Sequence, residues 1–323
     1  LDVRSPGEFE KGHIPGAINL PLFTNLERAE IGTIYKQIGA EPALLRGLEI
    51  VGPKMAWIVR KAAEFSKNKQ VAVHCWRGGQ RSKSVGWLLA MAGFQVKVLE
   101  GGYKAFRRAA APFFVKNNIQ LLVLGGKTGA GKTKILRKLA EKGAQVIDLE
   151  GLAHHKGSAF GALGESEQPT VEQFENRLFM AARQFDQSRP VWVENESHCI
   201  GRVFIPNGFW EKMKSSPIIV VEIPDGERIE NLCRDYAGQS MDGLKIAFKN
   251  IEKKLGGQHF KTAIEALAEG NMAKAAEIAL VYYDKTYEFG LEKSKENVVS
   301  NIMADEFDLE WILKITLVIL VSL

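Results

Sequence analysis

The chain has 323 residues, of which 46% are hydrophobic and 25% charged, with a formal net charge of +5. This is the balance of a soluble globular protein, and the length allows two domains of ordinary size. The three cysteines (Cys75, Cys199 and Cys233) are too few and too scattered for a disulfide framework or a zinc site, so we expect a reducing, cytoplasmic location.

Charge is unevenly distributed along the chain. Residues 1–116 hold 18 Lys and Arg against 9 Asp and Glu, a net charge of +9, whereas residues 117–323 hold 25 against 29, a net charge of −4. A basic first domain suits a polyanionic partner such as a nucleic acid. A basic surface that is only solvated would show the same excess of Lys and Arg. The charge therefore indicates a nucleic-acid partner only together with other sequence features.

The first domain, predicted over residues 1–114, alternates strands with helices. Residues 1–4 look like the end of a strand already under way, so we expect a few N-terminal residues to be missing. A turn at Pro6-Gly7 and a second short strand in "GHIPGAINLP" follow. Helix formers dominate residues 26–37 and 53–66, and a strand at 71–73, a helix from Ser82 (its N-cap), a strand from 95 and a helix at 103–114 complete the domain. This alternation predicts a parallel sheet.

A cysteine follows the strand at residues 71–73, in the loop "CWRGGQR" that leads to the helix. Backbone N–H groups and the positive end of the helix dipole meet at such a loop and favour the thiolate of Cys75. The residues around it form a candidate anion cradle: Arg77, Gly78, Gly79, Arg81 and Ser82. A buried structural cysteine is the alternative, although it leaves two glycines and two arginines without a purpose.

The second domain, predicted over residues 118–323 after a polar linker at 115–120, opens on "IQLLVLGGKTGAGKTKILRKLA". This is a strand, a glycine-rich turn and an amphipathic helix, the context of a phosphate-binding P-loop. Gly126, Gly129 and Gly131 would let backbone N–H groups reach the phosphates. Lys132 would contact the terminal phosphate, and Thr133 would hold a metal ion.

Acidic residues follow two further strands of this domain. "PVWVENESHCIG" places Glu194 and Glu196 after an apolar strand, and either could order a metal ion or water near the P-loop. Asp148 ends another strand and is a further metal or polar candidate. A pair of solvated acids at a strand end explains Glu194 and Glu196 equally well. We expect the adjacent His154 and His155 to lie in a loop and not to ligate a metal together.

The C-terminal third is predicted to be helical over "KNIEKKLGGQHFKTAIEAL" and "AAEIALVYYDKTYEFG". Lys245, Lys249, Lys253 and Lys254 recur there at helical spacing, as a solvated face or as a contact surface for tRNA. The apolar tail at residues 311–323 is too short for a spanning helix, so we expect a buried strand or helix and no membrane anchor.

About the first 110 residues resemble the rhodanese family. The matching stretches are "DVRSPGEFEKGHIPGAINLP", the Cys75 loop and "VLEGGYKAF". The resemblance implies a persulfide or perselenide carried on Cys75. Rhodaneses usually have four residues between the cysteine and the loop arginine, whereas five intervene here, as in the His-Cys-(five residues)-Arg-Ser signature of cysteine phosphatases. The wider loop has room for a tetrahedral oxyanion, which Arg81 would grip.

The order of rhodanese pattern, P-loop, "DLEGLAHHKGSAFG", "QPTVEQFEN" and "VENESHCIG" resembles the tRNA 2-selenouridine synthase family up to about residue 290. The resemblance implies replacement of sulfur by selenium at C2 of the wobble 2-thiouridine of certain tRNAs. The implied route is S-geranylation by geranyl diphosphate followed by displacement with selenium from selenophosphate. Implied partners are the tRNA and a selenophosphate-supplying enzyme, with no DNA, no membrane and no tightly bound cofactor; Mg²⁺ is a candidate.

On this hypothesis Cys75 carries selenium and the P-loop binds the diphosphate, so that nucleotide hydrolysis is not required. Candidate walls for the isoprenoid are Phe160, Phe174, Phe179, Phe204, Phe209 and Trp210, each of which is more often simple core. Two alternatives stay open. One is a cysteine-dependent phosphatase or sulfurtransferase fused to a kinase-like P-loop domain. The other is a non-catalytic module for tRNA binding or sulfur relay.

Overall fold

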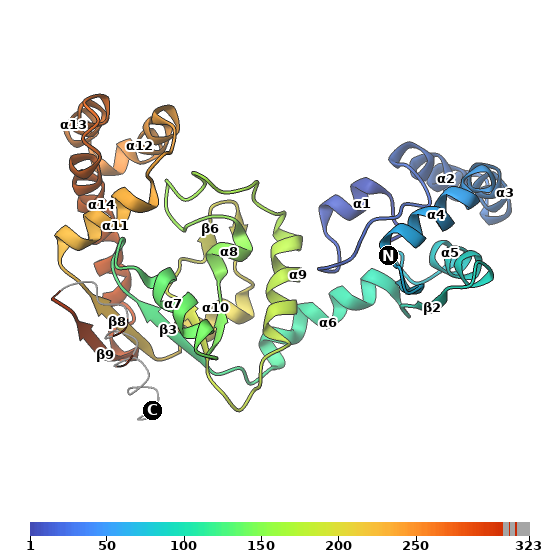
Figure 1. Cartoon of the computed structure of the whole chain (residues 1–323), viewed down its shortest axis with the longest axis horizontal. Coiled ribbons are helices and arrows are strands. Elements are labelled where there is room, and N and C mark those ends of the chain that lie inside the picture. Colours follow the sequence, from blue (N-terminus) through green and yellow to red (C-terminus); the bar gives the residue numbers. More distant parts are fainter. Residues whose placement is uncertain (306–309, 311–313, 315–323) are drawn as a thin grey trace. The chain divides into compact units, whose positions relative to one another are not determined.

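A computed structural model describes residues 1–305, 310 and 314 and divides the chain into two compact units (Figure 1). The first unit comprises Leu1–Phe113 and Glu175–Met180, and the second comprises Phe114–Phe174 and the chain from Ala181 onward. Both are α/β units whose sheets contain parallel strands, as predicted. The predicted strand or helix in the apolar tail lies outside the described residues, apart from Lys314.

The first unit surrounds two short parallel strands with helices. Its elements are α1 (Pro6–Lys11), α2 (Asn25–Gln37), α3 (Ala40–Val51), a 3-10 turn (Gly52–Lys54), α4 (Met55–Phe65), β1 (Gln70–Val73), α5 (Gln80–Met91), β2 (Gln95–Val98) and α6 (Gly102–Lys116). Because α6 continues to Lys116, the first two residues of the predicted linker at 115–120 are helical.

Side-chain caps explain why the first helix begins where it does. Ser5 and Glu8 form a capping box at the start of α1, and Pro6 occupies a first-turn position that needs no backbone donor. The helix therefore starts directly after Ser5. In place of the strands predicted at residues 1–4 and in "GHIPGAINLP", the structure has isolated bridges, which join Asp2 to Asn19 and to His74.

The helix after Cys75 begins three residues earlier than predicted. Gly79 is the N-cap of α5, so Ser82 lies inside the first turn and the prediction of Ser82 as N-cap was wrong. Ser82 is fully buried, and its hydroxyl oxygen lies 3.2 Å from the Gly79 carbonyl oxygen and 3.3 Å from Cys75 Sγ. Because Ser82 finds its partners inside the loop, its side chain is not available to cap the helix.

The second unit is built on a five-stranded parallel sheet with the order β4-β5-β3-β8-β9 (Figure 1). The strands are β3 (Leu121–Gly125), β4 (Gln145–Ile147), β5 (Val191–Glu194), β8 (Ile218–Glu222) and β9 (Val298–Met303), while β6 (Cys199–Ile200) and β7 (Val203–Phe204) form a small antiparallel pair. The accompanying helices are α7 (Lys132–Glu141), α8 (Leu149–Ala153), α10 (Asn207–Lys214) and α11 (Asp225–Asp235). The helix α9 (Val171–Ala182) is divided, because its residues Glu175–Met180 belong to the first unit.

β3 is the central strand and is buried along its whole length. Leu122 and Leu124 pack in one core with Ile135 of α7 and Trp192 of β5, as expected for a parallel strand covered on both faces. Parallel pairing places Leu124 opposite Glu194, so the carboxyl ends of β3 and β5 lie side by side. The loop after β3 and the acidic residues after β5 are therefore neighbours.

The C-terminal third is helical, as predicted, with α12 (Met241–Leu255), α13 (Gly257–Ala268) and α14 (Met272–Glu292). The first of the two predicted helical stretches is divided at Gly256 between α12 and α13. The three helices share a hydrophobic core with Phe160, to which Phe248, Leu267 and Ile278 contribute. Within the described ranges, no helix is long and apolar enough to cross a membrane.

Gly102→Ala should destabilise the first unit by at least roughly 2 kcal/mol. Gly102 has a φ of +58°, which costs an L-residue about 1–2 kcal/mol, and an added Cβ would overlap the carbonyl oxygen of Cys75. Denaturant unfolding of the full chain, followed by far-UV circular dichroism, measures the decrease. Gly52→Ala is the control, because Gly52 has helical backbone angles and open space around its Cβ position. Equal stability of the two variants would contradict the prediction.

Candidate functional site

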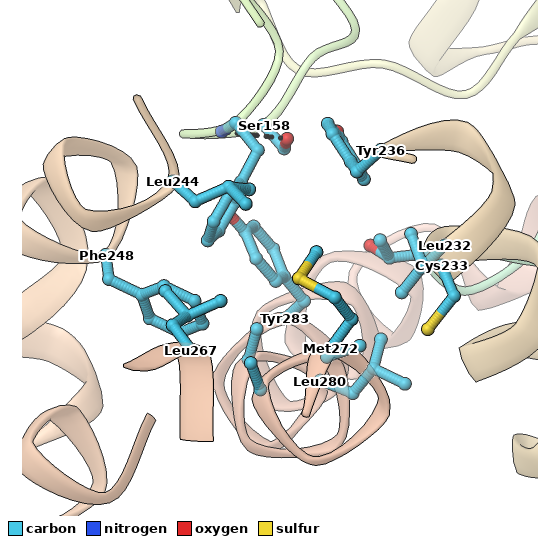
Figure 2. Close-up of a pocket in the computed structure, with 15 residues that line it drawn as sticks. Ser158, Leu232, Cys233, Tyr236, Leu244, Phe248, Leu267, Met272, Leu280 and Tyr283 are labelled. Carbon is cyan, nitrogen blue, oxygen red and sulfur yellow. Dashed lines mark hydrogen bonds between the residues drawn. The ribbon is translucent and has the colours of Figure 1, made fainter. Parts of the chain in front are cut away.

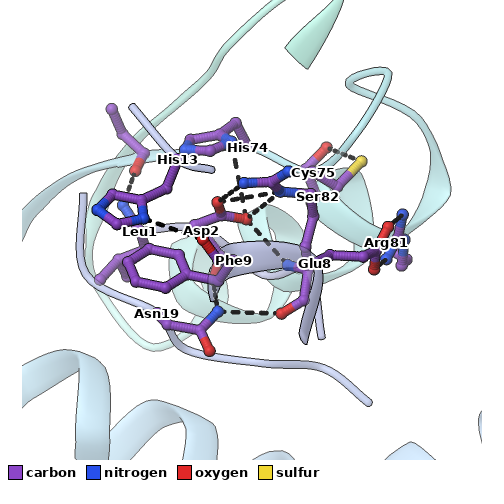
Figure 3. A network of polar contacts seen from close by, with 12 residues as sticks. Leu1, Asp2, Glu8, Phe9, His13, Asn19, His74, Cys75, Arg81 and Ser82 are labelled. Atoms are coloured by element: carbon purple, nitrogen blue, oxygen red, sulfur yellow. Dashed lines mark hydrogen bonds and ion pairs between the residues drawn. The ribbon is translucent and has the colours of Figure 1, made fainter. Parts of the chain in front are cut away.

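Cys75 lies in the loop between β1 and α5, as predicted (Figure 3). Its side chain is buried, and Sγ lies 3.3 Å from the Ser82 hydroxyl oxygen. The carbonyls of Cys75 and Trp76 accept hydrogen bonds at 2.9 Å from the N–H groups of Tyr103 and Lys104 in α6. Because the C=O and N–H of a trans peptide unit point in opposite directions, the N–H groups of these two units face away from α6. An anion would bind on that side.

The loop lowers the pKa of the Cys75 thiol. Burial alone would raise this pKa, but hydrogen bonds from the Ser82 hydroxyl and from the backbone N–H groups of Ser82 and Arg77, with the charge of Arg81, outweigh burial. The thiolate is the nucleophilic form of cysteine. The surroundings of Cys75 therefore suit a nucleophile better than an inert structural thiol.

Arg81 is held by an acidic partner that sequence reasoning missed. Its guanidinium donates to the Glu8 carboxylate at 2.7 and 3.3 Å. Burial would raise the pKa of Glu8, but the hydrogen bond and charge of Arg81 and the N–H of Ser5 lower it, so Glu8 stays ionised. An anion in the loop must share Arg81 with Glu8 or displace it.

The two loop glycines have different surroundings. Gly78 has a φ of +66°, and a Cβ there would lie 2.7 Å from the Leu99 carbonyl oxygen, so only glycine fits. Gly79 has open space at the Cβ position. Arg77 is exposed at the surface of the loop. Figure 3 shows a network of polar contacts around Asp2 and His74 near the loop. Asp2 is buried and binds Arg4 at 2.6 Å.

The loop after β3 has the backbone form of a phosphate-binding loop. Gly126, Gly129 and Gly131 have φ values of 150°, 85° and 77°, and a Cβ at either of the first two would lie 2.7 Å from a backbone carbonyl oxygen. The ammonium of Lys132 donates to the Gly126 carbonyl at 3.0 Å and lies 3.6 Å from the Glu194 carboxylate. Burial alone would lower the pKa of Lys132, but this carboxylate and its neighbours raise it, so the charge is kept.

Three carboxylates gather beside the hydroxyl of Thr133. Glu150, Glu194 and Glu196 each offer an oxygen within 4.8 Å of the others, and Thr133 Oγ1 lies 3.3 Å from both Glu150 and Glu194. Burial and the repulsion of neighbouring carboxylates raise the pKa of Glu150 to about 9 and that of Glu196 to about 7. This set of oxygen donors fits a hard cation such as Mg²⁺, which would relieve the repulsion.

Sequence reasoning found two members of this carboxylate group and missed the third. It left Glu194 and Glu196 as alternatives, and the structure brings both into the group. The missed member is Glu150, in the first turn of α8. Asp148, selected from the sequence, is the N-cap of α8 and accepts the Gly151 N–H at 2.7 Å. His154 ends the same helix and does not belong to the group.

The P-loop lines a polar cavity of about 460 Å³ that adjoins an apolar cavity, and Figure 2 shows the apolar one. The two cavities share the residues at their junction: Thr128, Ser158, Leu232, Tyr236 and Tyr283. Figure 2 shows that side chains from α12, α13 and α14 gather around the apolar cavity, among them Phe248, Leu267 and Met272.

Of the six aromatic residues considered as isoprenoid walls, Phe160 lines this apolar cavity and Trp210 lines a separate, larger one. The other four line none of these cavities. Phe174, Phe179 and Phe209 are buried in the cores, and Phe204 is half exposed.

The reactivity of Cys75 should depend on Ser82. In a Cys199→Ser/Cys233→Ser background, alkylation by iodoacetamide should titrate below the value of about 8.5 for a free cysteine. Ser82→Ala removes a hydrogen bond to the thiolate and should raise the midpoint by roughly one pH unit. Ser84→Ala is the control, because the Ser84 hydroxyl donates to the Gln80 carbonyl and is exposed. Equal midpoints for the two variants would contradict the prediction.

Comparison with known proteins covers both units. A family model described as "tRNA 2-selenouridine synthase AAA domain" matches residues 119–314, and a "Rhodanese-like domain" model matches residues 1–109. Proteins named tRNA 2-selenouridine synthase are similar along most of the chain. That of Sulfurovum sp. is 34% identical over 95% of this chain and 93% of its own. That of Hydrogenovibrio crunogenus is 34% identical over 91% and 90%, and that of Shewanella denitrificans is 32% identical over 93% and 90%. The chain therefore belongs to the tRNA 2-selenouridine synthase family.

Proposed function

We propose that this protein is an enzyme that replaces sulfur with selenium at C2 of the wobble 2-thiouridine in tRNA. The names of its relatives and the chemistry of its two sites support this function. The observation that carries the proposed route is the junction between the P-loop cavity and the apolar cavity. A P-loop suits a diphosphate, and an apolar cavity beside it suits a hydrocarbon chain. Geranyl diphosphate has both parts and can alkylate sulfur.

The first proposed step is alkylation of the thiocarbonyl sulfur. The sulfur attacks C1 of geranyl diphosphate, a C–S bond forms, the C1–O bond breaks with its electron pair on diphosphate, and N3 of the base loses its proton. Lys132 and the P-loop N–H groups would hold the charge of the leaving diphosphate. Thr133 and the three carboxylates would hold Mg²⁺, whose charge would add to that stabilisation.

The second proposed step exchanges the alkylated sulfur for selenium. A selenide nucleophile adds at C2, the C–S bond breaks, and the sulfur takes up a proton and leaves as geranylthiol. Alkylation prepares this step, because an unalkylated thiolate is a poor leaving group. Selenium in selenophosphate already has the oxidation state of selenide, so the exchange needs no oxidant or reductant.

Cys75 would release selenium from selenophosphate. A perselenide on Cys75, the form that the rhodanese resemblance implies, would require an oxidant. A balanced step is phosphoryl transfer: the thiolate forms an S–P bond, the P–Se bond breaks with its electron pair on selenium, and water then hydrolyses the phosphocysteine. The five residues between Cys75 and Arg81 and the lowered pKa of the thiol support this step.

The two sites should be separable by mutation. With thiolated tRNA and geranyl diphosphate, Lys132→Ala should slow formation of geranylated 2-thiouridine at least roughly 100-fold, because the leaving group then lacks one stabilising charge. Cys75→Ser should leave that product unchanged but prevent 2-selenouridine from forming when selenophosphate is added. Mass analysis of the nucleosides measures both products, with and without Mg²⁺.

Two outcomes of this assay would contradict the proposal. Full selenation by Cys75→Ser would remove the role of the thiol. An unmodified base in every mixture, with turnover of a simple phosphoester that depends on Cys75, would favour the cysteine phosphatase, the second candidate suggested by the Cys75–Arg81 spacing.

Filling the apolar cavity should weaken binding of the isoprenoid chain. The cavity has about 50 Å³ in this conformation, so a ten-carbon chain requires its wall to move, and the flexible Met272 is suited to that. Ala276→Phe should raise KM for geranyl diphosphate roughly tenfold by steric exclusion, and it should leave inhibition by inorganic diphosphate unchanged. Ala273→Phe, on the exposed face of α14, is the control. The same KM in both variants would place the chain elsewhere.

A further inference from the structure

A third cavity, of about 750 Å³, adjoins the P-loop cavity and has no role in the steps above. Its walls come from the segment after β5, from α10, and from the facing sides of α12 and α14. Its volume is within the range of sites that enclose a small molecule or a nucleotide. It shares Asn195, Glu196 and Tyr287 with the P-loop cavity, so the two cavities lie next to each other.

Aromatic rings and lysines alternate along the walls of this cavity. Lys254 lies 5.7 Å from the ring centre of Tyr282, and Lys293 lies 4.0 Å from that of Phe289. Phe289 is 66% exposed, which is unusual for a phenylalanine that serves only as core. Rings that can stack on bases, next to cations that can bind phosphates, are the features of single-stranded nucleic acid sites.

Charge on these walls favours an anion. Lys254 and Lys293 have no carboxylate within 4.0 Å among the residues that the structure describes, whereas Lys249, from the same predicted basic stripe, pairs with Glu252 at 2.6 Å. Glu196 is the single acidic residue among the described lining residues, and it lies at the P-loop end. Of the four lysines at helical spacing in the sequence (Lys245, Lys249, Lys253 and Lys254), Lys254 is the one that lines this cavity.

Three residues line the P-loop cavity, the apolar cavity and the third cavity alike: Thr128, Ser158 and Tyr283. A diphosphate in the P-loop and a chain in the apolar cavity would place the carbon that joins them next to these residues. A nucleophile must reach that carbon from a different direction than the diphosphate leaves, and the third cavity opens at the same point.

We propose that the third cavity receives the target nucleotide of tRNA, turned out of the anticodon stack. The base lies against the aromatic walls with its C2 sulfur toward Ser158 and Tyr283, while Lys254 and Lys293 bind the flanking phosphates. This inference rests on the proposed function for the identity of the nucleic acid. It adds the place where the base reacts.

The test is binding of a 2-thiouridine anticodon stem-loop RNA to the full chain, measured by fluorescence anisotropy at several salt concentrations. Lys254→Ala/Lys293→Ala should raise Kd at least tenfold and flatten the salt dependence, by about 0.7 in log–log slope for each phosphate that the variant no longer neutralises. Phe289→Ala should raise Kd severalfold, because a base can no longer stack there, and should leave the salt slope unchanged. Binding of inorganic diphosphate should stay the same in both variants.

The matched control is Lys245→Ala/Lys253→Ala, which removes two exposed lysines of α12 that do not line the cavity. Equally weakened binding in the control and the cavity variant would overturn the inference, because general charge would then explain binding. Unchanged Kd in the cavity variant would also overturn it. If RNA binding depends on the cavity but the 2-thiouridine base is never modified, the proposed function is refuted and the binding site stands. If Lys254→Ala/Lys293→Ala forms 2-selenouridine as fast as the unmodified protein, the binding site alone is refuted.

Discussion

The parallel pairing of β3 with β5 is the constraint on which the second unit's chemistry depends. It sets Leu124 opposite Glu194, so that the backbone turns into the P-loop beside the point where β5 releases its acids. The two strands are separated by about 65 residues in the sequence. Their pairing brings the ammonium of Lys132, the hydroxyl of Thr133 and the carboxylate of Glu194 to one edge of the sheet. Burial and the repulsion between neighbouring carboxylates raise the pKa values of Glu150 and Glu196 there. The ammonium of Lys132 acts in the opposite direction, as a bound metal ion would.

Features that depend on local chain geometry were predictable from the sequence. Three glycines at fixed spacing between an apolar strand and a helix permit few backbone paths, so the P-loop was placed correctly. The Cys75 loop, the parallel sheets and the C-terminal helices were found for the same reason. The prediction of Ser82 as N-cap was wrong because its buried hydroxyl contacts Cys75 Sγ and the Gly79 carbonyl within the loop. Helix propensity alone does not reveal these contacts.

Residues whose role depends on partners far along the chain were not predictable. Glu8 belongs to the Arg81 site because a capping box turns it toward a loop more than 70 residues away. Glu150 belongs to the carboxylate group because Asp148 caps α8 and Glu150 lies in the first turn of that helix. Sequence reasoning selected Asp148, because it ends a predicted strand, and missed Glu150. In both cases a helix cap sets the direction of a neighbouring acid, and a single sequence does not specify what lies in that direction.

A buried arginine is among the residues that tie the helical part of the second unit to the P-loop. Arg228 of α11 donates to the Thr128 carbonyl at 2.9 Å and binds Asp284 of α14 and Asp225. A buried pair of this kind is costly to break, by roughly 3–5 kcal/mol when one partner is removed. The helix that carries Tyr283, Ala276 and Phe289 is therefore fixed to the loop that would bind the diphosphate. On the proposed route, this junction and the ion pair between Lys127 and Glu288 at 2.7 Å would hold the P-loop against α14, so that the leaving group stays aligned with the apolar chain.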